Sequence, residues 1–191
     1  LPDTGFHRLA AGRAVVIADL GAPSAIDGVA HAGTFGFEMS IGRERLIVNC
    51  GSGGADRPEW LSAMRTTAAH STLAVDDTNS TEIRGDGRLN RRARPTAVNR
   101  NDADGAIWIE AAHDGYLQPF GLTHRRRLYL SAGGDDLRGE DQLIGAGGKT
   151  YALRFHLHPK VQASLIQNGE SVLLRLPSGQ GWRLRNRGGQ D

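Results

Sequence analysis

Residues 31–75, HAGTFGFEMSIGRERLIVNCGSGGADRPEWLSAMRTTAAHSTLAV, decide the fold. Apolar side chains alternate with small or polar ones over 35–41, which is the period of a strand with one face on a core. Gly42 interrupts this pattern, and 46–48 form a short apolar run that ends before Gly51. These features predict a β-hairpin that turns through residues 42–44.

The same stretch predicts a third strand and a place for chemistry. Residues 65–75 are rich in β-branched and apolar side chains, which favour a strand. The glycine-rich connection around 51–54 separates them from the hairpin. His31 and His70 lie at opposite ends of this stretch, where the two imidazoles could converge.

The remaining chain alternates short apolar runs with turn residues. Asn168-Gly169 between two such runs is a strong hairpin signal. Only residues 58–66 offer one or two helical turns. We therefore predict an all-β fold, a large antiparallel β-sandwich of the supersandwich type with little helix, as a single domain over residues 1–191. The expected core residues are Phe35, Phe37, Val48, Leu73, Trp108, Phe155 and Leu173.

Composition limits the classes of partner. The net charge is +2, and Lys149 and Lys160 are the only lysines among 23 basic residues, so arginine carries nearly all the positive charge. The guanidinium fork suits carboxylate, sulfate or phosphate, which favours acidic polymers; a GC-rich genome that writes Arg for Lys explains the bias equally well. Arginine content without aromatic interleaving does not indicate nucleic-acid binding.

Other classes lack their sequence signals. Cys50 is the only cysteine, which excludes an internal disulfide. No apolar run is long enough to cross a membrane, and no signal-peptide pattern occurs. Phosphate-loop and nucleophile-elbow motifs are also missing. The chain begins at Leu1 without an initiator Met, so we expect a fragment, and its parent's localisation stays open, with periplasm or secretion among the options.

Several short motifs occur in the order found in a known family. They are His31-Ala32-Gly33, residues 46–51 (LIVNCG), residues 65–73 (RTTAAHSTL), residues 113–116 (HDGY), residues 124–126 (HRR) and residues 155–159 (FHLHP). Together they resemble the β-sandwich domain of heparinase II/III-like proteins, a family that contains polysaccharide lyases. The resemblance covers most of the chain.

This resemblance implies β-elimination at a uronic acid in an acidic polysaccharide. The carboxylate is neutralised, a base removes the C5 proton, and an acid protonates the leaving oxygen. In such lyases a catalytic tyrosine and an asparagine or histidine lie on an α/α-toroid domain before the sandwich, which we expect to be missing here. The candidate catalytic residues are His31, His70 and Tyr116, and the candidate substrate-binding residues are Arg65, His113, His124 and Arg125.

The resemblance also implies a divalent metal, such as zinc, in the β-domain. Only His70 matches the expected ligands, because Val29 stands where a histidine is expected and Asn49 where an aspartate is expected. An apolar side chain cannot bind a metal, and a neutral amide is a poor zinc ligand. His156 and His158 share one strand face but supply only two ligands. No metal set is therefore predicted.

Two functions remain after these arguments. The chain is the β-sandwich of a polysaccharide lyase, inactive without its helical domain, or it is a non-catalytic module that binds acidic polysaccharide or packs against other domains. The retained His31, Arg65 and His70 favour the first. Val29 and Asn49, which stand where metal ligands are expected, favour the second.

Overall fold

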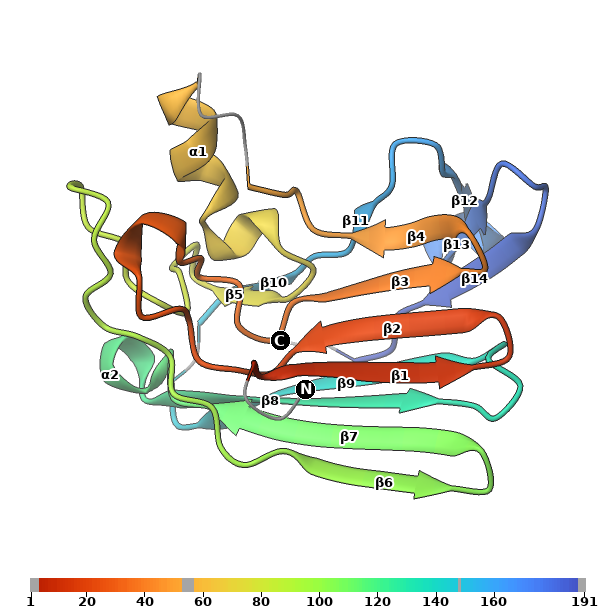
Figure 1. The fold of residues 1–191 in the computed structure, drawn as a ribbon, viewed down its shortest axis with the longest axis horizontal. Helices are drawn as coiled ribbons and strands as arrows, with labels where there is room; N and C mark the ends of the chain where they lie inside the picture. Colours follow the sequence, from red (N-terminus) through yellow and green to blue (C-terminus); the bar gives the residue numbers. More distant parts are fainter. Residues whose placement is uncertain (1–3, 53–56, 148, 189–191) are drawn as a thin grey trace.

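Residues 4–52, 57–147 and 149–188 are described by the computed structural model. One antiparallel sheet has the order β1-β2-β3-β4-β11 (Figure 1). Its strands are β1 (Phe6–Ala11), β2 (Ala14–Asp19), β3 (Phe37–Ile41), β4 (Glu44–Val48) and β11 (His156–Leu157). The β3–β4 connection is the hairpin predicted at 42–44, with Gly42 at φ +61°.

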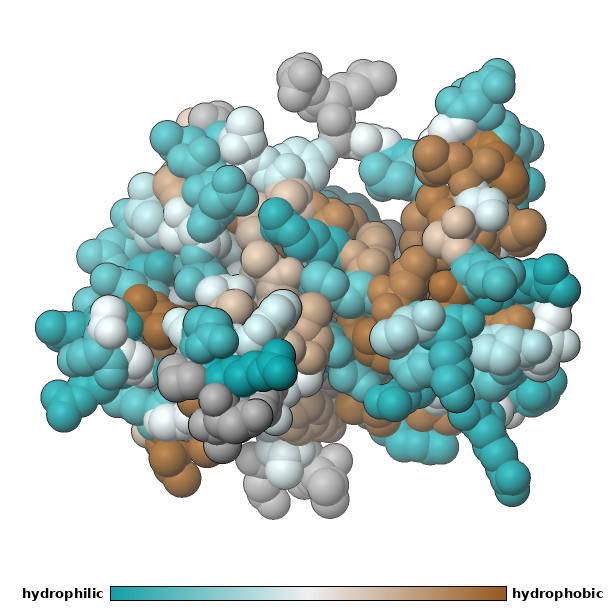
Figure 2. Space-filling view, turned by 90° about the horizontal axis from the view of Figure 1, so that it is seen from above, coloured by the Kyte–Doolittle hydropathy of each residue, from teal (hydrophilic) through white to brown (hydrophobic). Residues whose placement is uncertain are grey.

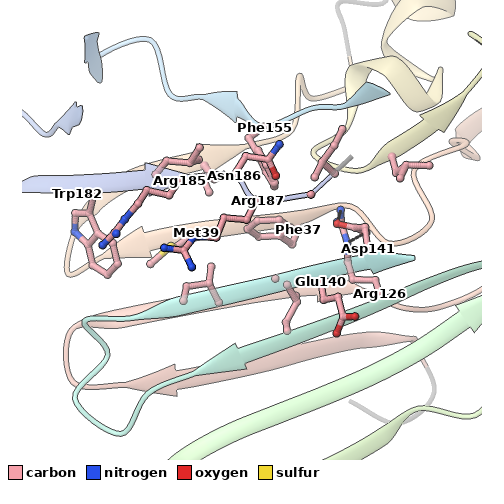
Figure 3. Close-up of a pocket in the computed structure, with 18 of the residues that line it drawn as sticks. Phe37, Met39, Arg126, Glu140, Asp141, Phe155, Trp182, Arg185, Asn186 and Arg187 are labelled. Carbon is pink, nitrogen blue, oxygen red and sulfur yellow. Dashed lines mark hydrogen bonds and ion pairs between the residues drawn. The ribbon is translucent and has the colours of Figure 1, made fainter. Parts of the chain in front are cut away.

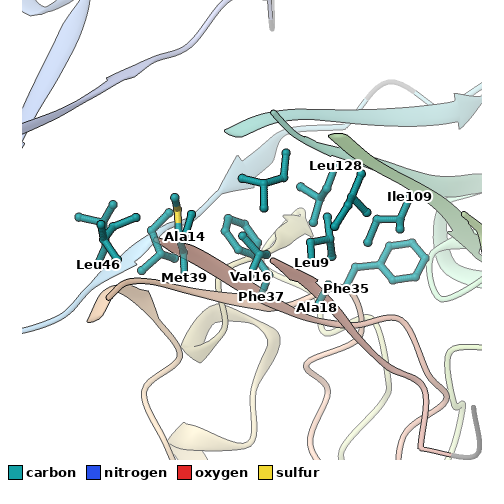
Figure 4. Packing of buried hydrophobic residues seen from close by; sticks show 14 of the residues in the cluster. Leu9, Ala14, Val16, Ala18, Phe35, Phe37, Met39, Leu46, Ile109 and Leu128 are labelled. Atoms are coloured by element: carbon teal, nitrogen blue, oxygen red, sulfur yellow. The ribbon is translucent and has the colours of Figure 1, made fainter. Parts of the chain in front are cut away.

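A second antiparallel sheet, in the order β6-β7-β8-β9, lies across from the first. Its strands are β6 (Asn99–Ala103), β7 (Ala106–His113), β8 (Leu122–Leu130) and β9 (Leu137–Gly145). Buried side chains from β1–β4 meet those of β7 and β8 in one hydrophobic core (Figure 4). Every second residue of β7 and β8 is buried, as a strand with one face on a core requires.

Smaller elements complete the molecule. β5 (Leu73–Val75) pairs with β10 (Tyr151–Leu153), and β12 (Gln162–Ile166), β13 (Ser171–Arg175) and β14 (Gly181–Arg185) form a three-stranded sheet at one end. The helices are α1 (Pro58–Met64) and α2 (Leu117–Phe120), with 3-10 turns at Asp27–Val29, Thr67–Ala69 and Gln167–Gly169. The all-β prediction with little helix is confirmed. Among the described residues, no helix is long and apolar enough to cross a membrane.

The third strand predicted over 65–75 is wrong in extent, since only Leu73–Val75 form a strand. Thr67–Ala69 form a 3-10 turn instead. The Thr67 hydroxyl donates to the Ala32 carbonyl at 2.7 Å, and its amide donates to Asn79 Oδ1 at 2.8 Å. These side-chain bonds hold the segment as a turn, because they replace the sheet bonds that a strand would make.

The core prediction is correct for Phe35, Phe37 and Leu73, which are buried. Val48, Trp108 and Phe155 are only partly buried. Leu173 is wrong: it is 39% exposed, whereas Leu174 and Leu176 are buried. Adjacent strand residues point to opposite faces, so an error of one residue exchanges the inner and outer sets.

Candidate functional site

Two imidazoles meet where the loop before β3 approaches the turn before β5. His31 Nδ1 lies 3.4 Å from His70 Nε2, and the rings meet edge to face at 85°. His70 Nδ1 also lies 2.8 Å from the Thr66 carbonyl oxygen. A carbonyl can only accept, so His70 Nδ1 carries a proton and neutral His70 presents the Nε2 lone pair to His31. His31 Nδ1 therefore donates the proton between the two rings.

Both rings are held neutral near pH 7. Burial lowers the pKa of His70 to about 4, against the opposing effect of the Thr66 carbonyl. Burial and the nearby Arg65 charge lower the pKa of His31, and the Met64 carbonyl opposes this. His31 is half-buried, while His70 is only 8% exposed. His31 is thus the member of the pair that a ligand could reach, and as a neutral imidazole it can accept a proton.

Gly33 permits this arrangement through close approach. A Cβ at Gly33 would lie 2.4 Å from His70 Cδ2, well inside van der Waals contact. Glycine at position 33 is therefore a steric requirement of the His70 ring position.

Arg65 acts beside the pair as a structural clamp. Its Nε donates to the Ala30 carbonyl at 2.7 Å, and Nη2 donates to the Asp27 carbonyl at 2.5 Å. Its own carbonyl accepts from the Ala32 amide at 2.8 Å. Arg65 is only 7% exposed, so its observed contacts hold the loop that carries His31. Its predicted substrate contact remains a prediction.

An arginine-lined cleft continues from this loop. Arg92 pairs with the Asp27 carboxylate and also donates to the Ser24 carbonyl. The cleft has a volume of about 510 Å³, and its lining residues are Ala22, Asn90, Arg91, Arg92, Ala93, Arg94, Asp114, Leu117 and Gln118. The Arg91 guanidinium donates to the carbonyls of Ser80 and Gly115. Arg94 is exposed, and within the described ranges its side chain has no ion pair.

A second side-chain pair lies on the other side of the Thr67–Ala69 turn. His156 Nε2 lies 2.9 Å from the Ala68 carbonyl, so it is the protonated nitrogen. His156 Nδ1 then accepts from Cys50 Sγ at 3.5 Å. Burial raises the pKa of the Cys50 thiol, so this contact does not produce a thiolate at neutral pH.

The residues do not fit the metal that the family resemblance implies. His31 and His70 supply two nitrogens, but Asn49 is engaged otherwise: its Oδ1 accepts from the Ser71 amide and its Nδ2 donates to Glu38. Val29 points outward with 66% exposure. In the part of the chain that the structure describes, no group of three His, Cys, Asp or Glu side chains could hold a metal ion. No chemistry is therefore derived through a metal.

His113 and His124 lie in a buried network instead of a cleft. His113 Nδ1 accepts from the Gly115 amide at 3.0 Å, so its Nε2 donates to His124 Nδ1 at 3.1 Å. His124 Nε2 then donates to Asp141 Oδ1 at 2.7 Å. Burial, followed by neighbouring positive charges, lowers the pKa of His113; burial also lowers that of His124, against the Asp141 carboxylate. Both rings are essentially unexposed.

Arg126 joins this network to the histidine pair. Its Nε and Nη2 donate to the Asp141 carboxylate at 2.7 and 3.0 Å. Its Nη1 donates to the carbonyls of Phe35 at 2.5 Å and Ser71 at 2.9 Å. Burial opposes ionisation of Asp141, yet the Arg126 charge and the His124 bond lower its pKa overall. Arg126 thereby fixes both chain segments next to His31 and His70.

Tyr116 and Arg125 also lie away from the histidine pair. Tyr116 is fully buried, its hydroxyl donates to the Leu73 carbonyl at 2.9 Å, and burial raises its pKa. Arg125 lies on the outer face of β8, where it bonds to Gln142. The structure thus brings His31, His70 and Arg65 together, and places Tyr116, His113, His124 and Arg125 elsewhere. Their roles toward substrate remain predictions.

Sequence reasoning missed the Arg126–Asp141 pair. A signal was available, because Leu122, His124, Arg126, Leu128 and Leu130 share one strand face. A charged residue on an apolar face requires a buried partner. Its identity could not be read from that strand.

Comparison with known proteins agrees with this architecture. FtsZ-localized protein C from Caulobacter vibrioides is 37% identical over 205 residues, which cover 97% of this chain and 35% of that protein. Heparan sulfate lyase HepC from Pedobacter heparinus superposes with a TM-score of 0.75 at 18% identity, over 95% of this chain and 27% of the lyase. The solved structure of the heparinase III-BT4657 gene product superposes with a TM-score of 0.73 at 17% identity, over 95% of this chain and 27% of that protein.

These matches place the chain in a family, although it spans only about a third of the length of its curated relative. The solved lyases share the fold. The sequence model described as "Heparinase II/III-like, C-terminal" matches residues 1–191. The chain therefore belongs to the heparinase II/III-like family, as its C-terminal domain.

Proposed function

We propose that this chain is the β-sandwich domain of a polysaccharide lyase that acts on uronic-acid-containing polysaccharide. The observation that carries the proposal is the His31–His70 pair, whose loop is tied to the arginine-lined cleft through the Arg92–Asp27 ion pair. His31 serves as the proton-accepting or proton-donating group, and His70 orients it. The heparan sulfate lyases that share the fold support this assignment.

The arginine-lined cleft is proposed to receive the acidic chain. Arg94 is the exposed guanidinium at this cleft and suits a carboxylate or sulfate. Arg91 and Arg92 are engaged with backbone carbonyls and Asp27, so they shape the cleft and add positive charge. Binding through exposed charge should be weak and sensitive to salt, because charges are screened beyond ~8 Å at physiological ionic strength.

Elimination is proposed to need a further domain. The hydroxyl of Tyr116 is buried against the Leu73 carbonyl, so it does not supply an accessible proton-transfer group in this chain. Loss of one positioned acid or base typically costs ~10²–10⁴-fold in rate. We expect residues 1–191 alone to be inactive and an upstream helical domain to restore turnover.

The test is absorbance of the unsaturated uronate product with heparin, heparan sulfate and alginate. Fusion to a family helical domain should give turnover that His31→Gln abolishes. His7→Gln, which changes a histidine on β1, is the matched control and should keep it. Robust turnover by residues 1–191 alone would overturn the two-domain scheme, and full activity of His31→Gln would overturn the role of the pair.

Salt-dependent binding tests the cleft separately. Heparan sulfate oligosaccharides should bind less tightly to Arg94→Gln than to the unchanged protein. Arg138→Gln is the control, because Arg138 lies on β9, its side chain is 74% exposed and it pairs with Asp136. An equal loss of affinity in both variants, or an affinity that does not fall as the salt concentration rises, would contradict the proposal that the cleft binds the acidic chain.

A second candidate function is a non-catalytic interaction module. It is favoured by the 37% identity to a protein named for localising with FtsZ, and by the incomplete metal set. Cosedimentation of the purified chain with FtsZ polymers, together with no turnover in the fused protein, would favour this role over the lyase.

A further inference from the structure

A cavity of about 510 Å³ lies between the two main sheets (Figure 3), and neither His31 nor His70 lines it. Apolar side chains from several strands line most of it. They include Phe37, Met39, Leu128, Leu137, Leu143 and Trp182. This volume and lining are typical of small-molecule sites, which span ~300–1,000 Å³ and are mostly apolar.

Gly139 is one reason for the space. Along β9 the residues at 137, 139, 141 and 143 all line the cavity, and position 139 carries no side chain. Gly139 pairs with Leu128 of β8. A Cβ at Gly139 would meet only Leu128 Cδ2, at 3.5 Å, and the Arg127 carbonyl at 4.0 Å, both ordinary contacts. The backbone would therefore accept a larger residue.

One end of the cavity is positively charged. Arg185 and Arg187 reach across it toward Trp182 and Met39 (Figure 3). Among the described residues neither arginine has an ion pair, whereas the acidic lining residues Glu140 and Asp141 already pair with Arg127 and Arg126. The cavity thus combines an apolar interior with two guanidinium groups, those of Arg185 and Arg187, that have no carboxylate partner within the described ranges.

The indole N–H of Trp182, at the same end of the cavity, is a buried donor that a ligand could satisfy. Trp182 Nε1 is shielded from solvent and has no hydrogen-bond partner among the residues that the structure describes. Buried indole N–H groups usually find an acceptor. Apolar surface also gathers around this end of the molecule, where Leu165 and Leu173 of the β12–β14 sheet are exposed (Figure 2).

We propose that this cavity binds a monomeric amphiphile, an unbranched apolar chain that ends in one anionic group. The chain lies between β3–β4 and β8–β9. The anionic group is held by Arg185 and Arg187 and accepts the Trp182 Nε1 proton. A carboxylate and a phosphate ester share this chemistry, because the guanidinium fork suits both.

The experiment measures binding to the purified 191-residue chain by isothermal titration and by Trp fluorescence, with decanoate below its micelle-forming concentration. Decyl phosphate distinguishes the two head groups, decanol removes the charge, and acetate removes the chain. We expect decanoate or decyl phosphate to bind with one-to-one stoichiometry. Decanol and acetate should bind at least about tenfold more weakly, since each lacks one half of the recognition.

Variants locate the site. Gly139→Phe fills the cavity and should abolish binding, while Gly85→Phe, at a glycine with nothing within 4 Å of a built Cβ, should leave it unchanged. Replacing Arg185 and Arg187 by Gln should weaken the binding of decanoate roughly three- to tenfold and leave the binding of decanol unchanged. Circular dichroism and thermal melting check that each variant is folded.

Several results would overturn the proposal. They are equal binding of decanoate and decanol, unchanged binding in folded Gly139→Phe, or no saturable binding of either anionic amphiphile. If Gly139→Phe fails to fold, Trp182→Phe replaces it as the deciding variant. It should weaken decanoate binding, detected calorimetrically, and an unchanged affinity there would also refute the site.

Discussion

Removal of the Asp141 charge tests whether the buried Arg126 pair holds the two sheets together. In Asp141→Asn the side chain keeps its shape, but an amide N–H₂ can face Arg126 where a carboxylate oxygen accepted. In the unchanged protein the Asp141 carboxylate accepts hydrogen bonds from Arg126 Nε and Nη2 and from His124 Nε2. Arg126 is 2% exposed, so its charge would remain buried with only carbonyl partners.

Breaking one side of a buried ion pair typically costs ~3–5 kcal/mol, against a total stability of ~5–15 kcal/mol. For a chain of this length such a loss lowers the Tm by about 10 °C. Calorimetric or circular-dichroism melting at pH 7 measures it. Asp102→Asn is the matched control, because its bidentate pair with Arg100 is solvent-exposed and should give a shift several times smaller.

A double-mutant cycle identifies the cause. If the unpaired charge is responsible, Arg126→Met combined with Asp141→Asn should lose less than the sum of the two single variants. The reasoning is refuted if Asp141→Asn melts within the range of Asp102→Asn, or if the two single changes simply add.

Three further outcomes follow from the same contacts. Burial lowers the pKa of His70 to about 4, below the value near 6.5 that it has in the unfolded chain. The free energy of unfolding should therefore fall by up to about 3 kcal/mol as the pH drops from 6.5 to 4, because the unfolded chain takes up the proton first. NMR titration of the imidazole should give the low pKa. Gly33→Ala should displace the His70 ring and lower the Tm, whereas Gly28→Ala, with open space around it, should not. Leu174→Ala should lower the free energy of unfolding in urea by ~2–5 kcal/mol, and Leu173→Ala should lower it much less. Similar losses in the two variants would contradict the assignment of Leu174 to the inner face and Leu173 to the outer face of β13.

Local sequence patterns determined most of the strands. The period-2 alternation of 35–41, the break at Gly42 and the Asn168-Gly169 turn each act within a few residues, so they could be read without tertiary contacts. The resemblance of short ordered motifs also led to the family that the match over residues 1–191 establishes. The sequence places His31 and His70 where the two rings could converge, and the structure puts Nδ1 of one 3.4 Å from Nε2 of the other.

Tertiary structure decided where the polar side chains go. Nothing near Arg126 in sequence identifies Asp141 as its partner, because the pair forms only when β8 and β9 align in register. Tyr116 follows a turn in a family-like motif, yet its hydroxyl is used inside the core. The cavity beside Gly139 exists only between two packed sheets. Such contacts join residues far apart in the chain, so periodicity predicts the strands but not the partners.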